Sequence, residues 1–379
     1  MKWVYSVAML LAIVAQARAQ ANLETVELFE AGRDGYHECR IPGIIVTAKN
    51  SILAYCEARK QGSDWGAIDI LMRRSTDGGK TWSAPARVAE LPAGAKRSPV
   101  APKKAPSSEA AITLNNPLAI ADRDGSVHFL YCVEYGRCFY RRSDDDGVTF
   151  SPAVEITDAF EPLRTTFDWR TVATGPGHGI QLKSGRLLVP VWISKGAGGN
   201  GHGDSRVSTI YSDDRGETWK AGEIVPDLTP PGSPNESAVV ELSDGRMMIN
   251  MRHASEPHYR AVSVSPTGID QWAAPHFDKQ LPEPVCMASL ARLDDGRILF
   301  SNPFVKSGRE RKNVTVRISD DNGATWRASR DLEPGPSAYS DLAVGADNVM
   351  YCFFERGEKR PYERLTFARF GLEWLIGRP

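Results

Sequence analysis

The sequence predicts an all-β protein, and more specifically a β-propeller built from six four-stranded antiparallel sheets. Three observations lead to this fold class: one turn motif is written four times, six polar turns each precede an apolar strand, and sustained 3.6-residue periodicity is scarce. Radial repetition of small sheets leaves only short, protected sheet edges. A β-sandwich is the alternative fold, and the regular six-fold spacing counts against it.

The repeated turn places an Asp, a Gly and a closing aromatic residue at fixed offsets. Its four copies are STDGGKTW from Ser75, SDDDGVTF from Ser143, SDDRGETW from Ser212 and SDDNGATW from Ser319. The last gap is too long for one repeat unit, but a degenerate copy, SPTGIDQW from Ser265, divides it into two nearly equal parts. The turn therefore marks a repeating structural unit.

A second series of segments gives the number of units. Polar turns lead into strands rich in β-branched and aromatic residues, and the first apolar residues of these strands are Ile52, Val127, Leu187, Met247, Ile298 and Val349. Six units of roughly 50 to 75 residues result, which is the spacing of a repeat architecture.

The aspartates of the repeated turn are expected to be structural. A carboxylate there accepts backbone N–H groups, the glycine supplies a positive φ, and the aromatic ring packs beside the next strand. The aspartates concerned are Asp77, Asp145, Asp214 and Asp321. Calcium binding is the alternative, but an EF-hand loop needs Gly at its sixth position, whereas from Asp144 the Gly is fourth.

The composition is that of a globular protein. The chain has 379 residues, of which 41% are hydrophobic and 25% charged, and its formal net charge is −1. This balance excludes a strongly basic nucleic-acid binder.

The first residues are expected to form a signal peptide. Residues 1–19 carry Lys2, an apolar stretch from Val4 to Ala15 and a small-residue cleavage site, so the cut is predicted between Ala19 and Gln20. A membrane anchor is the alternative, but the apolar run is too short to span comfortably. We therefore expect a secreted or periplasmic protein with no membrane span in the mature chain, and a single domain over residues 24–379.

Six cysteines leave the disulfide pattern open. They are Cys39, Cys56, Cys132, Cys138, Cys286 and Cys352. Cys132 and Cys138 flank a short turn and could pair in an exported protein, but buried free thiols are an equal alternative. Their spacing matches no zinc motif.

Several segments taken in order resemble the exo-sialidases, or neuraminidases. CRIPGIIV (Cys39 to Val46) is similar to the Arg-Ile-Pro motif of that family, and the repeated turns are similar to its Asp boxes, or BNR repeats. The resemblance continues through DWRTVATGPGHGIQL, NESAVVELSDGRMMINMR and YSDLAVGADNVMYCFFERG. A lone Asp box occurs in several kinds of propeller, whereas the ordered combination is specific.

The resemblance implies an arginine triad for the substrate carboxylate. The matching residues are Arg40, Arg252 and Arg311, and Arg59 resembles the additional pocket arginine of the family. Guanidinium groups suit this task because they pair bidentately with a carboxylate and stay charged. Arg309 is an alternative to Arg311, because on an alternating strand both would point the same way.

The same resemblance assigns the catalytic groups. Tyr339 matches the nucleophile, which in sialidases replaces the usual carboxylate, and Glu236 matches its activating base. Asp64 matches the general acid/base, with Asp69 as a competitor that we place in a strand. Glu355 matches the carboxylate that orients Arg40.

The strand series supports part of this assignment independently. Arg59, Arg252 and Glu355 stand near the ends of equivalent strands in their own units, and such ends converge on one face near the axis of a propeller. The chain departs from the family pattern at Arg170, Thr171, Val172 and Met287, which puts the preference for a particular sialic acid in doubt.

The expected function is that of an exported exo-α-sialidase that removes terminal sialic acid from glycoconjugates with retention, without a metal or another cofactor. A non-catalytic sialoglycan-binding propeller is one alternative, and a trans-sialidase that passes the sialyl group to a sugar is another. Linkage preference and oligomeric state are not predicted.

Overall fold

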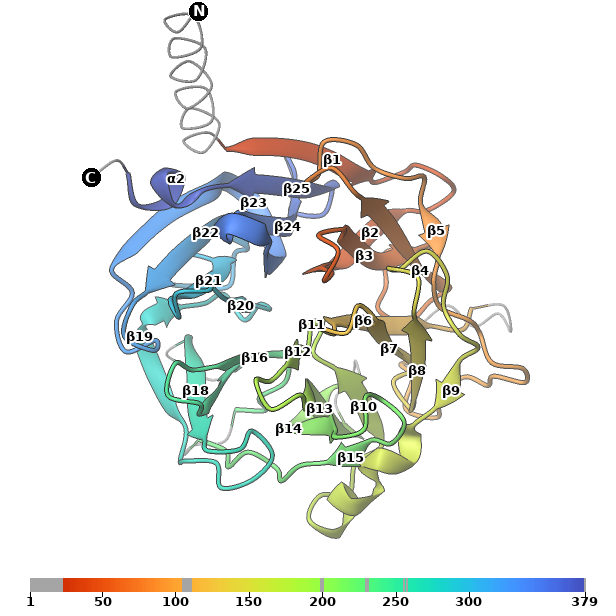
Figure 1. Cartoon of the computed structure of the whole chain (residues 1–379). Coiled ribbons are helices and arrows are strands. Elements are labelled where there is room, and N and C mark those ends of the chain that lie inside the picture. The colour runs from red at the N-terminus through yellow and green to blue at the C-terminus, as the bar shows by residue number, and fades with distance from the viewer. Residues whose placement is uncertain are drawn as a thin grey trace, which may run out of the picture.

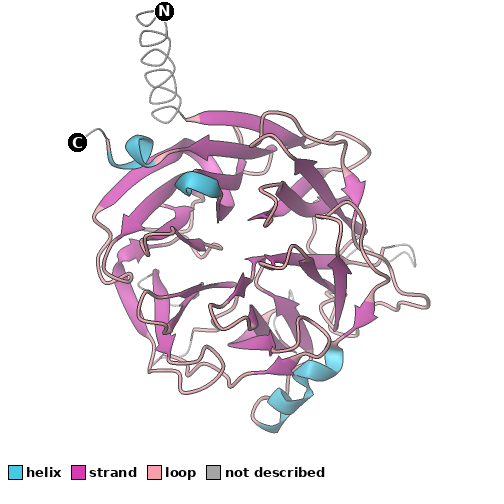
Figure 2. Ribbon diagram, in the orientation of Figure 1, coloured by secondary structure: helices cyan, strands magenta, loops and turns pink. Residues whose placement is uncertain are grey.

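Strands that follow one another along the chain also lie side by side in the sheets. The computed structural model describes residues 23–103, 111–197, 201–228, 232–254, 256 and 258–377, and most of their regular structure is strand (Figure 2). The prediction of an all-β fold is therefore confirmed. The predicted signal peptide, residues 1–19, and its cleavage site lie outside the described residues.

Four of the sheets contain four or five strands each. The first has the order β2 (Glu38–Val46), β3 (Ile52–Arg59), β4 (Ile68–Ser75) and β5 (Ala86–Arg87). The second runs β6 (Leu114–Ala121), β7 (Val127–Val133), β8 (Arg137–Ser143) and β9 (Val154–Glu155), with β11 (Gly177–His178) parallel to β6. The third runs β10 (Thr171–Thr174), β13 (Leu187–Ala197), β14 (Gly203–Ser212) and β15 (Lys220–Ala221), with β12 (Ile180–Gln181) against β13. The fourth runs β16 (Ser237–Glu241), β17 (Met247–Met251), β18 (Tyr259–Ser265) and β19 (His276–Pro282).

The fifth sheet has seven strands and contains both ends of the described chain. Its members are β20 (Ser289–Arg292), β21 (Ile298–Pro303), β22 (Lys312–Ser319), β23 (Ala328–Val344), β24 (Met350–Arg356), β25 (Arg364–Phe370) and β1 (Glu24–Glu30). The long strand β23 pairs with β22 through its first part and with β24 through its second, so it joins two groups of four strands. The first strand, β1, completes the second group by pairing antiparallel with β25.

The sheets are placed around a common centre (Figure 1). The first sheet packs against the last, because Ile44 and Ile52 share one apolar cluster with Phe353 and Phe367. Among the described residues the helical segments are short: η1 (Thr157–Thr165), η2 (Ala346–Asn348) and α2 (Leu372–Ile376).

The predicted strand series agrees with the structure. Five of the six predicted starts are the first residues of β3, β7, β13, β17 and β21, and the sixth strand, β24, begins one residue later than predicted, at Met350. The alternation of polar turn and apolar strand is thus a reliable signal here, since each of these strands is buried along most of its length.

The four repeated turns have the same internal hydrogen bonds. Each begins at the last residue of a strand, namely Ser75 of β4, Ser143 of β8, Ser212 of β14 and Ser319 of β22. In the third copy, Asp214 accepts the backbone N–H of Thr218 at 2.9 Å and its hydroxyl at 2.5 Å, and the Ser212 hydroxyl accepts the N–H of Gly216 at 2.7 Å. The other three copies repeat this pattern.

A glycine is required in this turn for two reasons. Gly79 has a φ of 89°, which side-chain-bearing residues rarely adopt, and a Cβ atom there would lie 2.3 Å from the Phe367 ring.

The six cysteines are free and buried. Cys132 and Cys138 face each other across β7 and β8 as thiols, so the free-thiol alternative is the one found. Within the described part of the chain, no helix has the length and apolar character needed to cross a membrane.

Candidate active site

One end of the strands nearest the centre carries the predicted site residues. Arg40 stands near the start of β2, Glu236 directly precedes β16, and Tyr339 lies where the second part of β23 begins. Arg59 ends β3 and Arg252 follows β17 by one residue. Antiparallel pairing places the end of β3 beside the start of β2 and the end of β17 beside the start of β16, so the side chains at these strand ends converge.

Tyr339 and Glu236 form the centre of this group. The Tyr339 hydroxyl lies 2.6 Å from Oε1 and 2.7 Å from Oε2 of Glu236, and its proton is donated to this carboxylate. Arg252 Nη1 donates to the Tyr339 oxygen at 2.8 Å and to Glu236 Oε2 at 2.5 Å. One arginine thus contacts both partners of a phenol–carboxylate pair.

The electrostatics of this pair favour a neutral phenol and an ionised carboxylate. Burial raises the pKa of Tyr339 well above its ordinary value, and the neighbouring Glu236 charge raises it further. Burial also raises the pKa of Glu236, but Arg252 and the hydrogen bond from Tyr339 outweigh burial, so the pKa of Glu236 is lowered. Glu236 is therefore ionised, and its carboxylate already accepts the hydrogen bond of the Tyr339 hydroxyl.

Glu355 holds Arg40 and the nucleophile candidate at the same time. Its carboxylate accepts Arg40 Nε at 3.0 Å and Nη2 at 3.3 Å, and it also accepts the backbone N–H of Ile41 at 3.1 Å and of Tyr339 at 3.0 Å. Glu355 is fully buried. Its four hydrogen bonds compensate the cost of burying the charge and fix two functional residues.

Arg311 lies in the site and Arg309 does not. Arg311 Nη1 donates to the Tyr362 hydroxyl at 3.2 Å, Nη2 donates to the Val285 carbonyl at 3.0 Å, and the guanidinium lies 5.2 Å from the Tyr339 ring centroid. Arg309 is exposed and donates to the Ala254 carbonyl. The expectation of a common direction on one strand is wrong, because β22 begins only at Lys312.

The charge of Arg311 suits an anionic ligand. Its two hydrogen bonds described above end on a phenol and a carbonyl, which are neutral oxygens, whereas Arg40 and Arg252 each have a carboxylate partner. A carboxylate placed between the three guanidinium groups would be attracted by all of them.

Asp64 stands at the edge of the site, paired with Arg59. Arg59 Nη1 lies 2.7 Å from Asp64 Oδ1, and the side chain of Asp64 is 47% exposed, whereas that of Arg59 is 2% exposed. Burial raises the pKa of Asp64, but Arg59 and Arg40 outweigh burial and hold the pKa well below its ordinary value. Asp69 lies elsewhere: it is in β4, as expected, and accepts the Tyr36 hydroxyl at 2.7 Å.

Two further residues of the site are absent from the sequence prediction. Glu57 is fully buried and accepts Arg59 Nε at 3.0 Å and Nη2 at 2.7 Å. Its position two residues before Arg59 on one strand could have indicated this contact. Tyr362 lies with its ring 4.0 Å from the Arg40 guanidinium, but it comes from the turn between β24 and β25, which no repeat signal marks.

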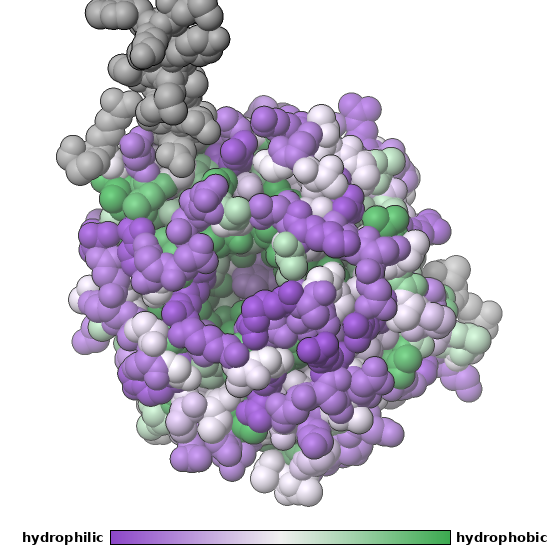
Figure 3. Space-filling model, in the orientation of Figure 1, coloured by the Kyte–Doolittle hydropathy of each residue, from purple (hydrophilic) through white to green (hydrophobic). Residues whose placement is uncertain are grey.

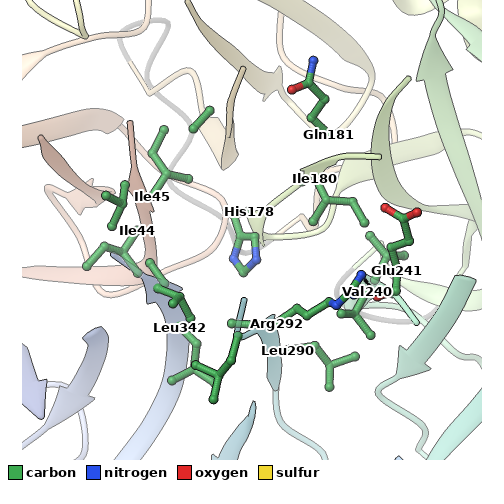
Figure 4. Close-up of a pocket in the computed structure, with 18 of the residues that line it drawn as sticks. Ile44, Ile45, His178, Ile180, Gln181, Val240, Glu241, Leu290, Arg292 and Leu342 are labelled. Atoms are coloured by element: carbon green, nitrogen blue, oxygen red, sulfur yellow. Dashed lines mark hydrogen bonds between the residues drawn. The ribbon is translucent and has the colours of Figure 1, made fainter. Parts of the chain in front are cut away.

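A separate cavity of about 530 Å³ lies at the other end of the same strands. Its lining includes Ile44 and Ile45 of β2, Leu342 of β23, and His178 (Figure 4). None of the candidate catalytic residues lines it. In the orientation of Figure 1, the molecular surface is hollowed at its centre, with hydrophobic residues inside and hydrophilic residues around the rim (Figure 3).

Comparisons with known proteins show which family the chain resembles. A BNR repeat-like domain matches residues 50–352. The chain is 31% identical over 379 aligned residues to a sialidase of Micromonospora viridifaciens, covering 91% of this chain and 53% of that protein. It is 30% identical over 331 residues to a sialidase of Bacteroides fragilis, covering 80% of this chain and 56% of that protein. The chain thus spans about half the length of these curated relatives.

A solved structure gives a similar result. The Hadza microbial sialidase Hz136 superposes with a TM-score of 0.77 at 25% sequence identity, over 93% of this chain and 69% of that one.

Proposed function

The chain belongs to the sialidase family with BNR repeats, and on that premise we propose that it is an exo-α-sialidase. The proposed reaction is the hydrolysis of terminal sialic acids from glycoproteins, glycolipids or oligosaccharides, with retention at the anomeric carbon. The observation that carries the proposal is the contact of Tyr339, Glu236 and Arg252 with one another in a site that holds three further arginines, Arg40, Arg59 and Arg311.

The arginines account for substrate selection. A sialic acid carries a carboxylate on its anomeric carbon, so an enzyme must hold an anion beside the reacting centre. Arg40, Arg252 and Arg311 would bind this carboxylate, and Arg59 would border the pocket beside Asp64. The binding energy of the carboxylate would then orient the anomeric carbon over the Tyr339 oxygen.

A tyrosine nucleophile suits an anionic substrate. A carboxylate nucleophile would be repelled by the substrate carboxylate, whereas the neutral phenol of Tyr339 is not. In the first step the Tyr339 oxygen bonds to the anomeric carbon, Glu236 takes the phenol proton, and the bond to the leaving oxygen breaks. The leaving oxygen receives a proton from Asp64.

The second step reverses the roles. Asp64 takes a proton from a water molecule, the water oxygen bonds to the anomeric carbon, and the bond to Tyr339 breaks while Glu236 returns its proton. Two displacements give net retention. The reaction uses side chains alone as written, so we propose no cofactor.

Asp64 must hold a proton to act as the acid, although Arg59 and Arg40 lower its pKa in the empty site. We infer that the substrate carboxylate counteracts this lowering of the Asp64 pKa. Its negative charge next to Arg40 opposes the field of the guanidinium groups and raises the pKa of Asp64 when the substrate is bound. Asp64 is thus protonated in the complex with substrate, where it acts as the acid.

We also propose that the groups of four strands are the six blades of one closed propeller over residues 24–379. The pairing of β1 with β25 and the ion pair of Arg40 with Glu355 join the first and last groups and support closure. Export, with cleavage between Ala19 and Gln20, is proposed from the sequence alone.

One assay tests the proposed activity. The purified protein is incubated with an α-sialoside that carries a fluorogenic aglycone, with and without lactose, over a broad pH range. Release of free sialic acid supports hydrolysis, and formation of sialyllactose instead would point to the trans-sialidase alternative. Binding of the sialoside without release at any pH would overturn the enzyme assignment in favour of the sialoglycan-binding alternative.

A further inference from the structure

A buried ion pair behind the candidate site connects two of its arginines. Arg260 of β18 and Glu283, the residue after β19, lie 2.8 Å apart between Nη1 and Oε2, and both side chains are 0% exposed. Neither contacts the Tyr339–Glu236 pair in the hydrogen bonds described above. A buried pair of this kind contributes little to stability by itself, so its hydrogen-bond partners indicate what it does.

The first partner lies beside Arg252. Glu283 Oε1 accepts the backbone N–H of His253 at 2.9 Å, and Arg260 binds Asn250 through Nε at 2.5 Å and through Nη2 to the carbonyl at 3.1 Å. The pair therefore holds the backbone on both sides of Arg252. The Nε atom of Arg252 has no hydrogen-bond partner among the described residues, so its guanidinium is aimed by the two contacts of Nη1 together with this anchored backbone.

The second partner is Cys286, which follows the residue that binds Arg311. Arg260 Nη1 donates to the Cys286 carbonyl at 2.8 Å, and Glu283 Oε2 lies 3.4 Å from the Cys286 N–H. These bonds fix the segment in which Val285 adopts a φ of 57°, an unfavourable conformation for a β-branched residue. The carbonyl of Val285 accepts Arg311 Nη2 at 3.0 Å.

We propose that Glu283, with its partner Arg260, is a positioning residue that sets Arg252 and Arg311 for one anion. This proposal rests on the proposed function and adds to it the pair of residues that keeps Arg252 and Arg311 in position to bind the substrate carboxylate. Glu283 is placed where the chain passes from β19 to β20, so its carboxylate reaches the backbone beside Arg252 and the segment whose Val285 carbonyl binds Arg311.

The test compares a charged ligand with an uncharged one that differs from it by one methyl group on the carboxyl oxygen. The probes are free sialic acid and its methyl ester, with Kd measured by calorimetry. In the wild-type protein the acid binds more tightly than the ester, because only the acid meets the arginines as an anion. The preference for the acid is the Kd of the ester divided by the Kd of the acid. In Glu283→Gln we expect this ratio to fall about tenfold, since small displacements of aligned charged groups are costly.

The control is a second buried carboxylate away from the site. Asp146 binds Arg74, Thr47 and Ser51, and its side chain is 5% exposed. Asp146→Asn is expected to lower thermal stability and to keep the preference for the acid within twofold of wild type. Loss of stability alone is thereby separated from loss of positioning.

Arg260→Lys keeps the buried charge and removes the planar set of donors, and it serves if Glu283→Gln does not fold. We expect it to lower the preference severalfold. A folded Glu283→Gln or Arg260→Lys protein with the wild-type preference would overturn the positioning role. A wild-type protein that binds neither probe would overturn the proposed function instead.

Discussion

The hydroxyl of Tyr339 lies 2.6 Å from Oε1 of Glu236, although the two residues are 103 positions apart in the chain. Glu236 directly precedes β16, Tyr339 lies where the second part of β23 begins, and Arg252 binds both. The lowered pKa of Glu236 keeps this carboxylate ionised beside the neutral phenol, and the short contact means that the proton can pass without rearrangement of either side chain.

Removal of the base should abolish most of the activity. We expect Glu236→Gln to lower kcat by roughly 10²- to 10⁴-fold, because the phenol then has no acceptor for its proton. The matched control is Glu241→Gln, at the other end of the same strand, where the carboxylate accepts the N–H of Lys183. Steady-state kinetics with a sialoside checks both variants, and equal losses in the two would contradict the assignment of the base.

Asp64→Ala should discriminate between leaving groups. A sugar alkoxide needs a proton to depart, whereas an acidic phenol does not. We therefore expect a loss of roughly 10²- to 10⁴-fold in kcat/KM for sialyllactose and a much smaller loss for an aryl sialoside. Asp69→Ala should leave both rates near those of wild type. An equal loss for the two substrates in Asp64→Ala would count against an acid role.

The two neighbouring arginines provide an internal comparison. Arg311→Ala removes a guanidinium that faces the site, and we expect KM to rise roughly 10- to 100-fold, the value of a charge-assisted hydrogen bond or two. Arg309→Ala removes an exposed side chain and should change KM less than twofold. A larger rise in Arg309→Ala than in Arg311→Ala would refute the placement of the third arginine.

The stability of the fold should depend on pH through His178. Its Nδ1 lies 2.8 Å from Oδ1 of Asp341. Burial lowers the pKa of His178, but Asp341 outweighs burial, so the folded-state pKa is raised above 6.5. The contribution to the free energy of unfolding is therefore fully present below pH 6.5 and is lost as pH rises through the folded-state pKa.

Denaturant titration of wild type and His178→Gln between about pH 5.5 and 8.5 measures this contribution. We expect the difference in free energy of unfolding between the two proteins to shrink as pH rises. A difference that stays constant, or that grows with pH, would show that His178 is not charged in the folded protein.

The repeated turns should affect stability rather than catalysis. Asp214→Ala removes the acceptor of the Thr218 backbone N–H and hydroxyl. We expect the free energy of unfolding to fall by roughly 1 to 2 kcal/mol, with kcat/KM unchanged. Thermal denaturation and a sialoside assay of the same sample check both statements, and a loss of activity without a loss of stability would point to a functional role for the turn.

The strands could be predicted because the chain repeats itself. Each polar turn before an apolar run marks the start of a buried strand, and the starts of β3, β7, β13, β17 and β21 follow directly from this pattern. The residues at equivalent strand ends, such as Arg59 and Arg252, could be found by the same register.

The remaining parts of the site depend on contacts that no repeat encodes. Tyr362 reaches Arg40 and Arg311 from an irregular turn, and Glu283 binds backbone groups of His253 and of Cys286 in its own connecting segment. The choice between Arg309 and Arg311 likewise depends on where β22 begins. Side-chain direction just before a strand is set by tertiary packing rather than by alternation.

The central claim is that Tyr339 attacks the anomeric carbon, and covalent trapping tests it most directly. The reagent is a sialyl fluoride with a second fluorine on the carbon beside the anomeric centre, which slows release of the intermediate more than its formation. After quenching and proteolysis, mass spectrometry should find the added sialyl group on the peptide that contains Tyr339, and no adduct in Tyr339→Phe. An active wild-type enzyme whose adduct lies on another residue, or persists in Tyr339→Phe, would contradict the assignment.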